Sequence, residues 1–315
     1  MKIFNRLKCL KITKRLAKDK KGTSIVLFAA ALTVFAACAA LTIDIGAVVV
    51  EKSKLSTAVD AAALAGLQEY LTGSGNTTLV AENYLNKNID ELESTKVTIG
   101  ADNKSVQVTA VKKSDNYFST MLKESLGSIT ATAVAKAETI KSMTGTRPLA
   151  VVQQSFIYGK QYTLKEGAGD GTSGNYAAMA LGDNGSSTYA NNILYGYAGV
   201  VTVGDVIPTQ TGNMVINTVQ SINTLINGCT HTPACTYTDY NSTCTRIISI
   251  PVVNTLDING KKYVSILGFA TFFLEGVNNS GGSADIIGRF ITYSAQGETS
   301  STINDYGTYG MRLVK

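Results

Sequence analysis

Four side chains that commonly bind metal ions lie close together in the sequence of this 315-residue chain. They are Cys229, His231, Cys235 and Cys244, within sixteen residues. Cysteine and histidine are the usual ligands of zinc, but the C-x-H-x3-C-x8-C spacing matches no common zinc finger, ribbon or knuckle. We therefore expect one disulfide among the three cysteines, with the third thiol left over, and no metal. The sequence leaves open which two of them pair.

Catalytic arrangements have little support in the remaining residues. His231 is the only histidine, so a Ser-His-Asp or Cys-His mechanism would have to use it inside the loop that holds the predicted disulfide. The nucleophile elbow G-x-S-x-G does not occur, and the acids are too scattered to single out a glycosidase-like pair. We expect a protein that is not an enzyme.

Two loop motifs are explained by turn chemistry. Residues 169–174 read G-x-G-x-x-G, but the strand, the helix and the acid of a dinucleotide fingerprint are missing around them. Asp170, Asp183 and Asn184 offer oxygen atoms to calcium, yet their spacing fits no EF-hand loop, and Asp, Asn and Gly favour turns. We expect no cofactor.

The basic charge of the chain is concentrated at its N-terminal end. Residues 1–21 carry nine Lys or Arg side chains and one acid, Asp19, for a net charge of +8. Because the whole chain is +5, the remainder is −3. This distribution argues against a nucleic-acid-binding surface on the body of the protein.

An uncharged segment follows directly after the basic tail. The 22 residues from Gly22 to Ile43 are mostly apolar, which is long enough to span about 30 Å of hydrocarbon as a helix. The Lys/Arg cluster in front of it predicts a cytoplasmic N-terminus and an extracellular body, in a single-pass membrane protein. Signal-peptide cleavage and lipidation at Cys38 are the alternatives, but the apolar run continues well past that residue, so we expect the segment to be retained as an anchor.

Three spaced elements around this segment form a recognisable pattern. They are Lys20-Lys21-Gly22, then Thr42-Ile43-Asp44-Ile45-Gly46, then Ala58-Val59-Asp60-Ala61-Ala62-Ala63-Leu64-Ala65-Gly66. Over residues 20–66 the chain resembles the N-terminal domain of the TadE/TadG-like proteins. The resemblance implies a part in assembling or anchoring Flp-type (tight adherence) pili. No Asp-x-Ser-x-Ser metal motif of the longer TadG relatives is present, and Gly22 is not followed by the Glu of processed pilins.

The predicted membrane helix continues outward with a stripe of apolar and small residues. Leu55, Val59, Ala62 and Gly66 recur at helical spacing, so this face packs either on the protein's own first domain or against another subunit. Asp44, near the outer end of the span, either sits among the headgroups or pairs with a partner helix. From the motif and the stripe together, our candidates for helix packing and assembly are Asp44, Gly46, Asp60, Ala62 and Gly66.

The pattern of elements predicts an α+β protein with a long N-terminal transmembrane helix. We expect a cytoplasmic tail at 1–21, a membrane helix at 22–50, a TadE/G-like helix with a small α+β unit at 51–147, and a β-rich extracellular domain at 148–315. In the small unit, helices are predicted at 79–89 and 116–126, and strands at 96–99, 105–111 and 129–135. In the β-rich domain, strands are predicted at 150–156, 200–207, 246–253, 263–274 and 286–293, with one amphipathic helix over 215–226 and a turn at Asn259-Gly260.

These features together favour a structural or accessory component of pilus assembly that acts by recognition. The expected partners are other pilus-assembly or envelope proteins and the lipid bilayer, with a homo-oligomer as a further possibility. The alternative from another class is a membrane-tethered extracellular hydrolase or carbohydrate-binding protein, which the Tyr- and Asn-rich stretch at 176–197 suggests. A deep pocket lined by paired acids would favour that alternative.

Overall fold

The computed structural model of the chain describes residues 20–73, 75–114, 127–166, 175–210, 212–256, 263–280 and 282–314. The basic tail before residue 20, the predicted helix at 116–126, the G-x-G-x-x-G stretch at 169–174 and the Asn259-Gly260 turn lie outside the described residues.

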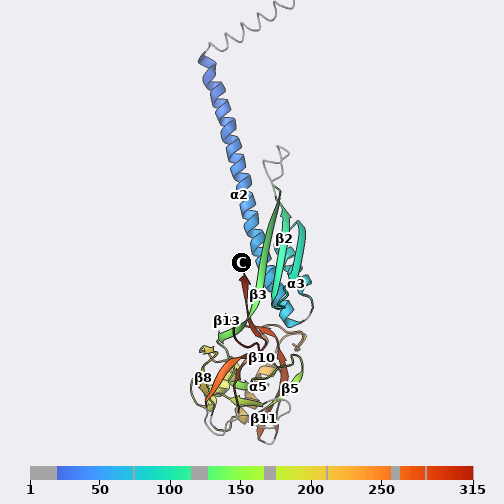
Figure 1. Cartoon of the computed structure of the whole chain (residues 1–315), viewed down its shortest axis with the longest axis vertical. Coiled ribbons are helices and arrows are strands. Elements are labelled where there is room, and N and C mark those ends of the chain that lie inside the picture. The colour runs from blue at the N-terminus through green and yellow to red at the C-terminus, as the bar shows by residue number, and fades with distance from the viewer. Residues whose placement is uncertain are drawn as a thin grey trace, which may run out of the picture. The chain divides into compact units, whose positions relative to one another are not determined.

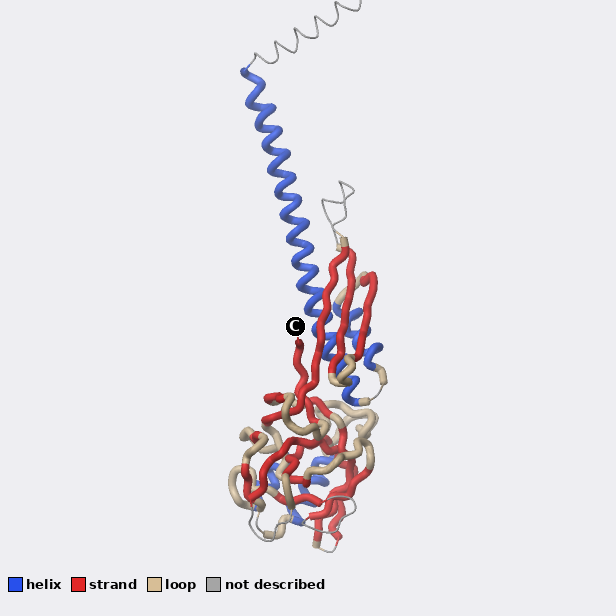
Figure 2. The backbone as a smooth tube through the Cα atoms, viewed as in Figure 1, coloured by secondary structure: helices blue, strands red, loops and turns tan. Residues whose placement is uncertain are grey.

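The first described element is a single helix of 53 residues, α2 (Lys20–Thr72), drawn without a break in Figures 1 and 2. At about 1.5 Å per residue it is roughly 80 Å long. It contains no proline, and it ends at Gly73, whose φ of 74° and N–H bond to the Tyr70 carbonyl (3.1 Å) form a left-handed helix end. The other described helices are α3 (Thr77–Asn88), α4 (Ser186–Tyr195) and α5 (Val215–Asn227).

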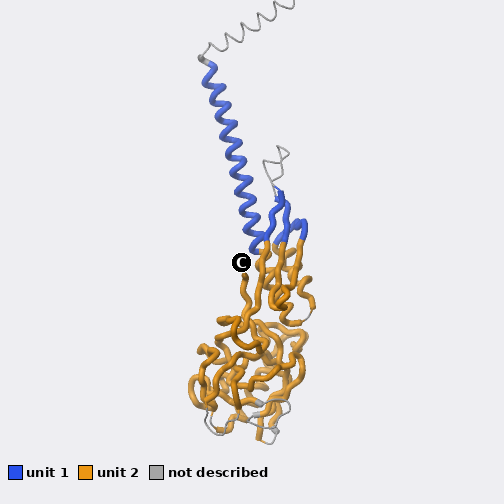
Figure 3. Tube along the Cα trace, in the orientation of Figure 1, with its two compact units in different colours: residues 1–57, 89–94, 110–131 blue, residues 58–88, 95–109, 132–315 orange. Residues whose placement is uncertain are grey.

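Contacts within the chain define two compact units. Unit 1 consists of residues 1–57, 89–94 and 110–131, and unit 2 of residues 58–88, 95–109 and 132–315. Figure 3 colours the two units and shows that α2 contributes residues to both. The domain limits predicted at 50 and 147 stay predictions.

One seven-stranded sheet combines the first three described strands, a short strand at Val201–Thr202 and three strands near the C-terminal end of the chain. Its order is β1-β2-β3-β14-β12, and β13 and β7 also pair with β3. The hairpin between β1 and β2 turns at Asn103 (φ 52°), and the Asp102 carboxylate accepts hydrogen bonds from the Lys104 N–H and the Ser105 hydroxyl. Its strands are β1 (Leu92–Ile99), β2 (Ser105–Lys113), β3 (Ser128–Met143), β7 (Val201–Thr202), β12 (Tyr293–Ser294), β13 (Glu298–Ser300) and β14 (Thr308–Val314).

The C-terminal strand returns to the first half of the chain. β14 runs antiparallel to β3, with Tyr309 opposite Thr139 and Val314 opposite Val134. Arg312 of β14 pairs with Glu138 of β3 at 2.6 Å, and Thr308 of β14 shares a buried hydrogen bond with Thr271 of another strand at 2.9 Å. This long-range pairing joins the end of the sequence to a strand that starts near residue 128.

The second seven-stranded sheet has the order β11-β5-β6-β4-β9-β10-β8. Because β11 pairs with β10 as well as with β5, the pairings of six of these strands close into a ring. The longest described strand, β10, pairs with three others, β8, β9 and β11, along its length. The strands are β4 (Leu149–Val152), β5 (Gln161–Glu166), β6 (Asn175–Ala178), β8 (Val206–Pro208), β9 (Ile247–Val253), β10 (Tyr263–Ser280) and β11 (Ser283–Ile291).

The main core follows from alternation along these strands. Alternate residues of β9 (Ile248, Ile250, Val252) and of the middle of β10 (Ala270, Phe272, Leu274) are buried in it. Helices α4 and α5 add Tyr189, Ile193, Ile222 and Leu225. Three aromatic rings fix its centre, with Phe290 4.9 Å from Phe272 and 5.0 Å from Tyr162 between ring centroids. The structure confirms the predicted fold class, a long N-terminal helix followed by mixed sheets with few helices.

Candidate functional site

The first half of α2 exposes apolar side chains on every side. Among the described residues, Gly22–Thr72 is the one helix long and apolar enough to cross a membrane, and none of its most apolar stretch is buried. Ile25 is 72% exposed and Leu27 is 73% exposed, and two residues of an α-helix place these side chains on nearly opposite sides. A helix that is apolar all round and unburied is suited to lipid. The structure thus contains the predicted candidate transmembrane segment.

A buried face begins on α2 at the C-terminal end of this segment. Asp44 is 1% exposed although Ile43 and Ile45 on either side are each 52% exposed, and Leu55 further along is fully buried. Glu51 forms an ion pair with Lys112 at 3.0 Å in unit 1, where both side chains are largely covered. The Asp44 carboxylate therefore lies on the side of the helix that faces the protein.

The other assembly candidates differ in their surroundings. Gly46 is exposed, and a Cβ added there would meet nothing within 4 Å. Asp60 is half-buried and Ala62 is fully buried. At Gly66 a Cβ would lie 3.1 Å from the Ala81 Cβ of α3, so α2 and α3 approach closely at this glycine. The assembly role of these residues stays a prediction.

The four side chains of the cysteine–histidine motif meet at one point. Their ligand atoms, three Sγ atoms and one imidazole nitrogen, all lie within 4.8 Å of one another. The Cys229 Sγ is 3.8 Å from the His231 Nδ1. Cys235 and Cys244 are buried, whereas Cys229 and His231 are half-buried. All three thiols are free in this structure, and the predicted disulfide among them stays a prediction.

The neighbouring elements hold this cluster from three directions. Cys229 follows α5 immediately after Gly228, and Cys244 lies three residues before β9. The Thr245 hydroxyl donates to the Leu225 carbonyl at 2.6 Å, which ties the end of the loop to α5. The two buried thiols pack on Phe273 of β10 and Ile291 of β11.

Local hydrogen bonds make the thiols unequal. The backbone N–H of Cys235 and, after it, the His231 ring lower the pKa of the Cys229 thiol to about 6. Burial raises the pKa of the Cys244 thiol to about 12. Two further groups bond to Cys235. The Arg246 guanidinium donates to its carbonyl at 3.0 Å, and the Asn241 N–H donates to its Sγ at 3.5 Å. Neither contact was predicted from the sequence. No sequence pattern links such residues to the cysteines, because they meet through the fold of the loop.

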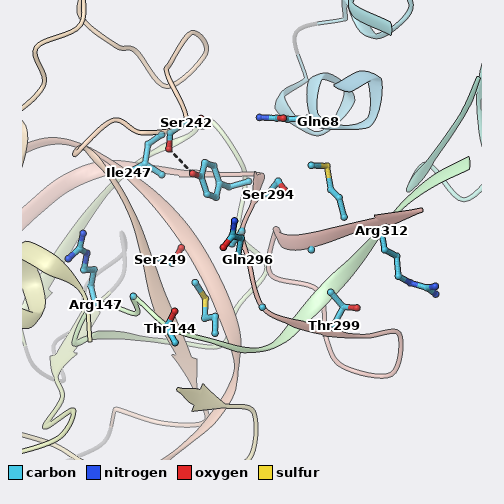
Figure 4. Close-up of a pocket in the computed structure, with 17 residues that line it drawn as sticks. Gln68, Thr144, Arg147, Ser242, Ile247, Ser249, Ser294, Gln296, Thr299 and Arg312 are labelled. Atoms are coloured by element: carbon cyan, nitrogen blue, oxygen red, sulfur yellow. Dashed lines mark hydrogen bonds between the residues drawn. The ribbon is translucent and has the colours of Figure 1, made fainter. Parts of the chain in front are cut away.

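One described pocket lies in unit 2 and has a volume of about 800 Å³. Its polar lining includes Arg147 and Arg312, and the described residues around it include no Asp or Glu. Figure 4 shows these side chains and the hydrogen bond from the Tyr293 hydroxyl to the Ser242 carbonyl, 2.8 Å long. Burial lowers the pKa of the Arg147 guanidinium to about 10, which leaves it charged at neutral pH. A pair of acids for glycoside hydrolysis is thus missing from this pocket as described.

Comparison with known protein families identifies the N-terminal region. Residues 22–69 match the family model of the Flp pilus-assembly TadE/G-like domain, Tad. The match covers the apolar half of α2 and most of its packed half. Comparisons with curated proteins and with solved structures gave no match.

The TadE/G-like match confirms the resemblance predicted from the three spaced elements. It also includes all five assembly candidates, from Asp44 to Gly66, because they lie between residues 22 and 69. The cysteine–histidine cluster and the second sheet lie outside the matched region. The match to the TadE/G-like model therefore bears on α2 and says nothing of the cysteine–histidine cluster.

Proposed function

We propose that this chain is a membrane-anchored, non-enzymatic component of Flp-type pilus assembly. The apolar half of α2 crosses the bilayer, the basic tail lies in the cytoplasm, and residues 70–315 lie outside the cell. The observation that carries the proposal is the TadE/G-like match at 22–69 on a helix whose apolar half is exposed on all sides.

The orientation rests on charge. Nine basic side chains precede Gly22 on one side of the span, whereas the remainder of the chain has a net charge of −3. Lys and Arg are retained on the cytoplasmic side of bacterial membranes. The same distribution leaves the body without the basic surface that nucleic-acid binding needs.

Recognition would use the membrane-proximal part of α2. Beside the buried Asp44, the helix exposes Ile45, Gly46, Val49 and Val50, and the glycine leaves room for a neighbouring backbone. Small residues on an exposed helix face allow close approach of a second helix in a membrane. We propose that a helix of another pilus-assembly protein, or of a second copy of this chain, packs on this face.

A cell-based experiment tests orientation, retention and function. Protease added to intact protoplasts is expected to digest residues 70–315 and to spare the tail, and the mature chain in the membrane fraction is expected to keep Gly22 to Val50 without an acyl group at Cys38. Deleting the gene is expected to remove Flp-type pili from the host cell, and the full-length chain is expected to restore them. A body that stays protected until lysis would refute the orientation, and normal piliation without the protein would refute the function.

A further inference from the structure

We propose that Cys229, His231, Cys235 and Cys244 together bind one zinc ion, which holds the loop between α5 and β9 in place. This site goes beyond the proposed role in pilus assembly and does not depend on it. On this proposal the three cysteines, which were expected from the sequence to form one disulfide, bind a metal ion together with His231.

The geometry matches the size of a zinc site. In a tetrahedral site with Zn–S bonds of about 2.3 Å and a Zn–N bond of about 2.0 Å, the ligand atoms lie about 3.5 to 3.8 Å from one another. The Cys229 Sγ and the His231 Nδ1 are 3.8 Å apart, and all four ligand atoms lie within 4.8 Å of one another. Small side-chain rotations are enough to bring the atoms around one ion.

The set of ligands also suits a structural site. Three thiolates and one histidine form a closed zinc coordination sphere with no position left for substrate. A disulfide would need only two of the sulfur atoms together, and it gives no reason for the third thiol and the only imidazole of the chain to lie at the same place.

Groups around the ligands hydrogen-bond to them or bring charge close to them in ways that support a bound metal. The Asn241 N–H points at the Cys235 Sγ (3.5 Å), and such N–H donors stabilise metal-bound thiolates. Arg246 donates to the Cys235 carbonyl at 3.0 Å and to the Leu274 carbonyl at 2.9 Å, which places a positive charge next to a site with three thiolates.

The loop itself needs such a cross-link. Between the end of α5 at Asn227 and the start of β9 at Ile247, the chain forms no helix or strand. Loops of this length inside a compact unit are uncommon unless something other than regular structure holds them. The four ligands come from the start, the middle and the end of this loop, so one ion would fix all three parts.

A zinc ion there would also order a neighbouring surface. Tyr240 and Ser242 of the loop line a second pocket of about 300 Å³ together with residues of the C-terminal end of α2, all within unit 2. The Tyr240 hydroxyl donates to the Thr292 carbonyl at 3.3 Å, and the Tyr293 hydroxyl donates to the Ser242 carbonyl. Loss of the metal would therefore loosen this wall of the pocket.

Metal analysis of the full-length chain tests the site. The protein is purified in detergent without chelators, supplied with zinc chloride, freed of unbound ion by gel filtration, and measured by elemental analysis. We expect about one zinc per chain in the wild type and in Cys38→Ser, whose thiol lies on the exposed segment of α2. We expect less than one tenth of that in Cys244→Ser, and retention in His231→Cys, which keeps four ligands. No zinc in the wild type, or an undiminished content in Cys244→Ser, would overturn the proposal.

Two measurements on the unmutated chain guard against variants that fail to fold. Cobalt(II) in place of zinc is expected to give the thiolate charge-transfer and tetrahedral ligand-field bands of a Cys3His site. Thiol titration in denaturant with chelator but without reductant is expected to find all five cysteines free. Two missing thiols, or a cobalt spectrum without thiolate bands, would establish the disulfide or another site in place of zinc.

Discussion

Gly66 provides the sharpest test of how α2 packs in unit 2. A Cβ at this position would lie 3.1 Å from the Ala81 Cβ and 3.4 Å from the Val106 Cγ1, and the Thr77 carbonyl closes the third side at 3.5 Å. Gly66→Leu therefore forces a whole side chain into occupied space. Overpacking costs about 1 to 3 kcal/mol, and a whole leucine side chain with atoms this close belongs at the upper end of that range. The better helix propensity of leucine offsets at most about 1 kcal/mol, so we expect a net loss of about 2 kcal/mol.

The matched control lies on the same helix. Gly46→Leu makes the same chemical change where nothing lies within 4 Å of the added Cβ. The chain contains no tryptophan but 15 tyrosines, so thermal unfolding of the full-length protein in detergent can be followed by near-ultraviolet circular dichroism. We expect Gly66→Leu to lower the Tm by about 4 to 8 °C and Gly46→Leu not to lower it, because there the helix propensity of leucine meets no opposing clash.

The same pair of variants separates folding from assembly. On the proposed function, Gly46→Leu should reduce piliation although the protein remains stable, because the leucine fills the space for a neighbouring helix. If Gly66→Leu melts with the wild type, the close approach of α2 and α3 is wrong. If Gly46→Leu supports full piliation, the exposed face around that glycine is not a contact site.

Two further predictions concern unit 2. Burial alone would raise the pKa of Asp305, but bonds from the Lys104 ammonium (2.7 Å), the Gly307 N–H and the Tyr309 hydroxyl outweigh it and lower the pKa. A lowered pKa stabilises the fold above the ordinary Asp value of about 3.9, and this contribution is lost as the pH falls below it, so Asp305→Asn should flatten the pH dependence of urea unfolding in that range. Equal acid sensitivity of both proteins would contradict this. Phe272→Ala removes a fully buried ring from the core of the second sheet and should cost about 3 to 5 kcal/mol in the same assay, and a loss below about 1 kcal/mol would show that the ring is not packed as described.

The strongest local patterns of the sequence correspond to observed elements. The strands expected at 105–111 and 246–253 appear as β2 and β9, and the amphipathic helix expected over 215–226 appears as α5. In each of these segments the apolar residues recur with the period of a strand or a helix, and this pattern depends only on residues close together in the sequence. Strands β5, β6 and β14 were not predicted, because such short segments have only a weak intrinsic preference for β-structure and become strands only when a partner strand is present.

The amino-acid sequence by itself determined the long apolar helix, the charge asymmetry around it and the TadE/G-like motif, because each depends only on the types and spacing of residues along one segment. The tertiary structure alone decided that β14 pairs with β3 and that β10 and β11 close the second sheet. It also brought Cys229, His231, Cys235 and Cys244 to one point. Zinc-binding spacings in known motifs reflect particular loop shapes, and this loop has a different shape, set by α5, β9 and the Arg246 hydrogen bonds. Ligand spacing along the chain therefore predicted a disulfide, whereas the proposed metal site rests on distances in space.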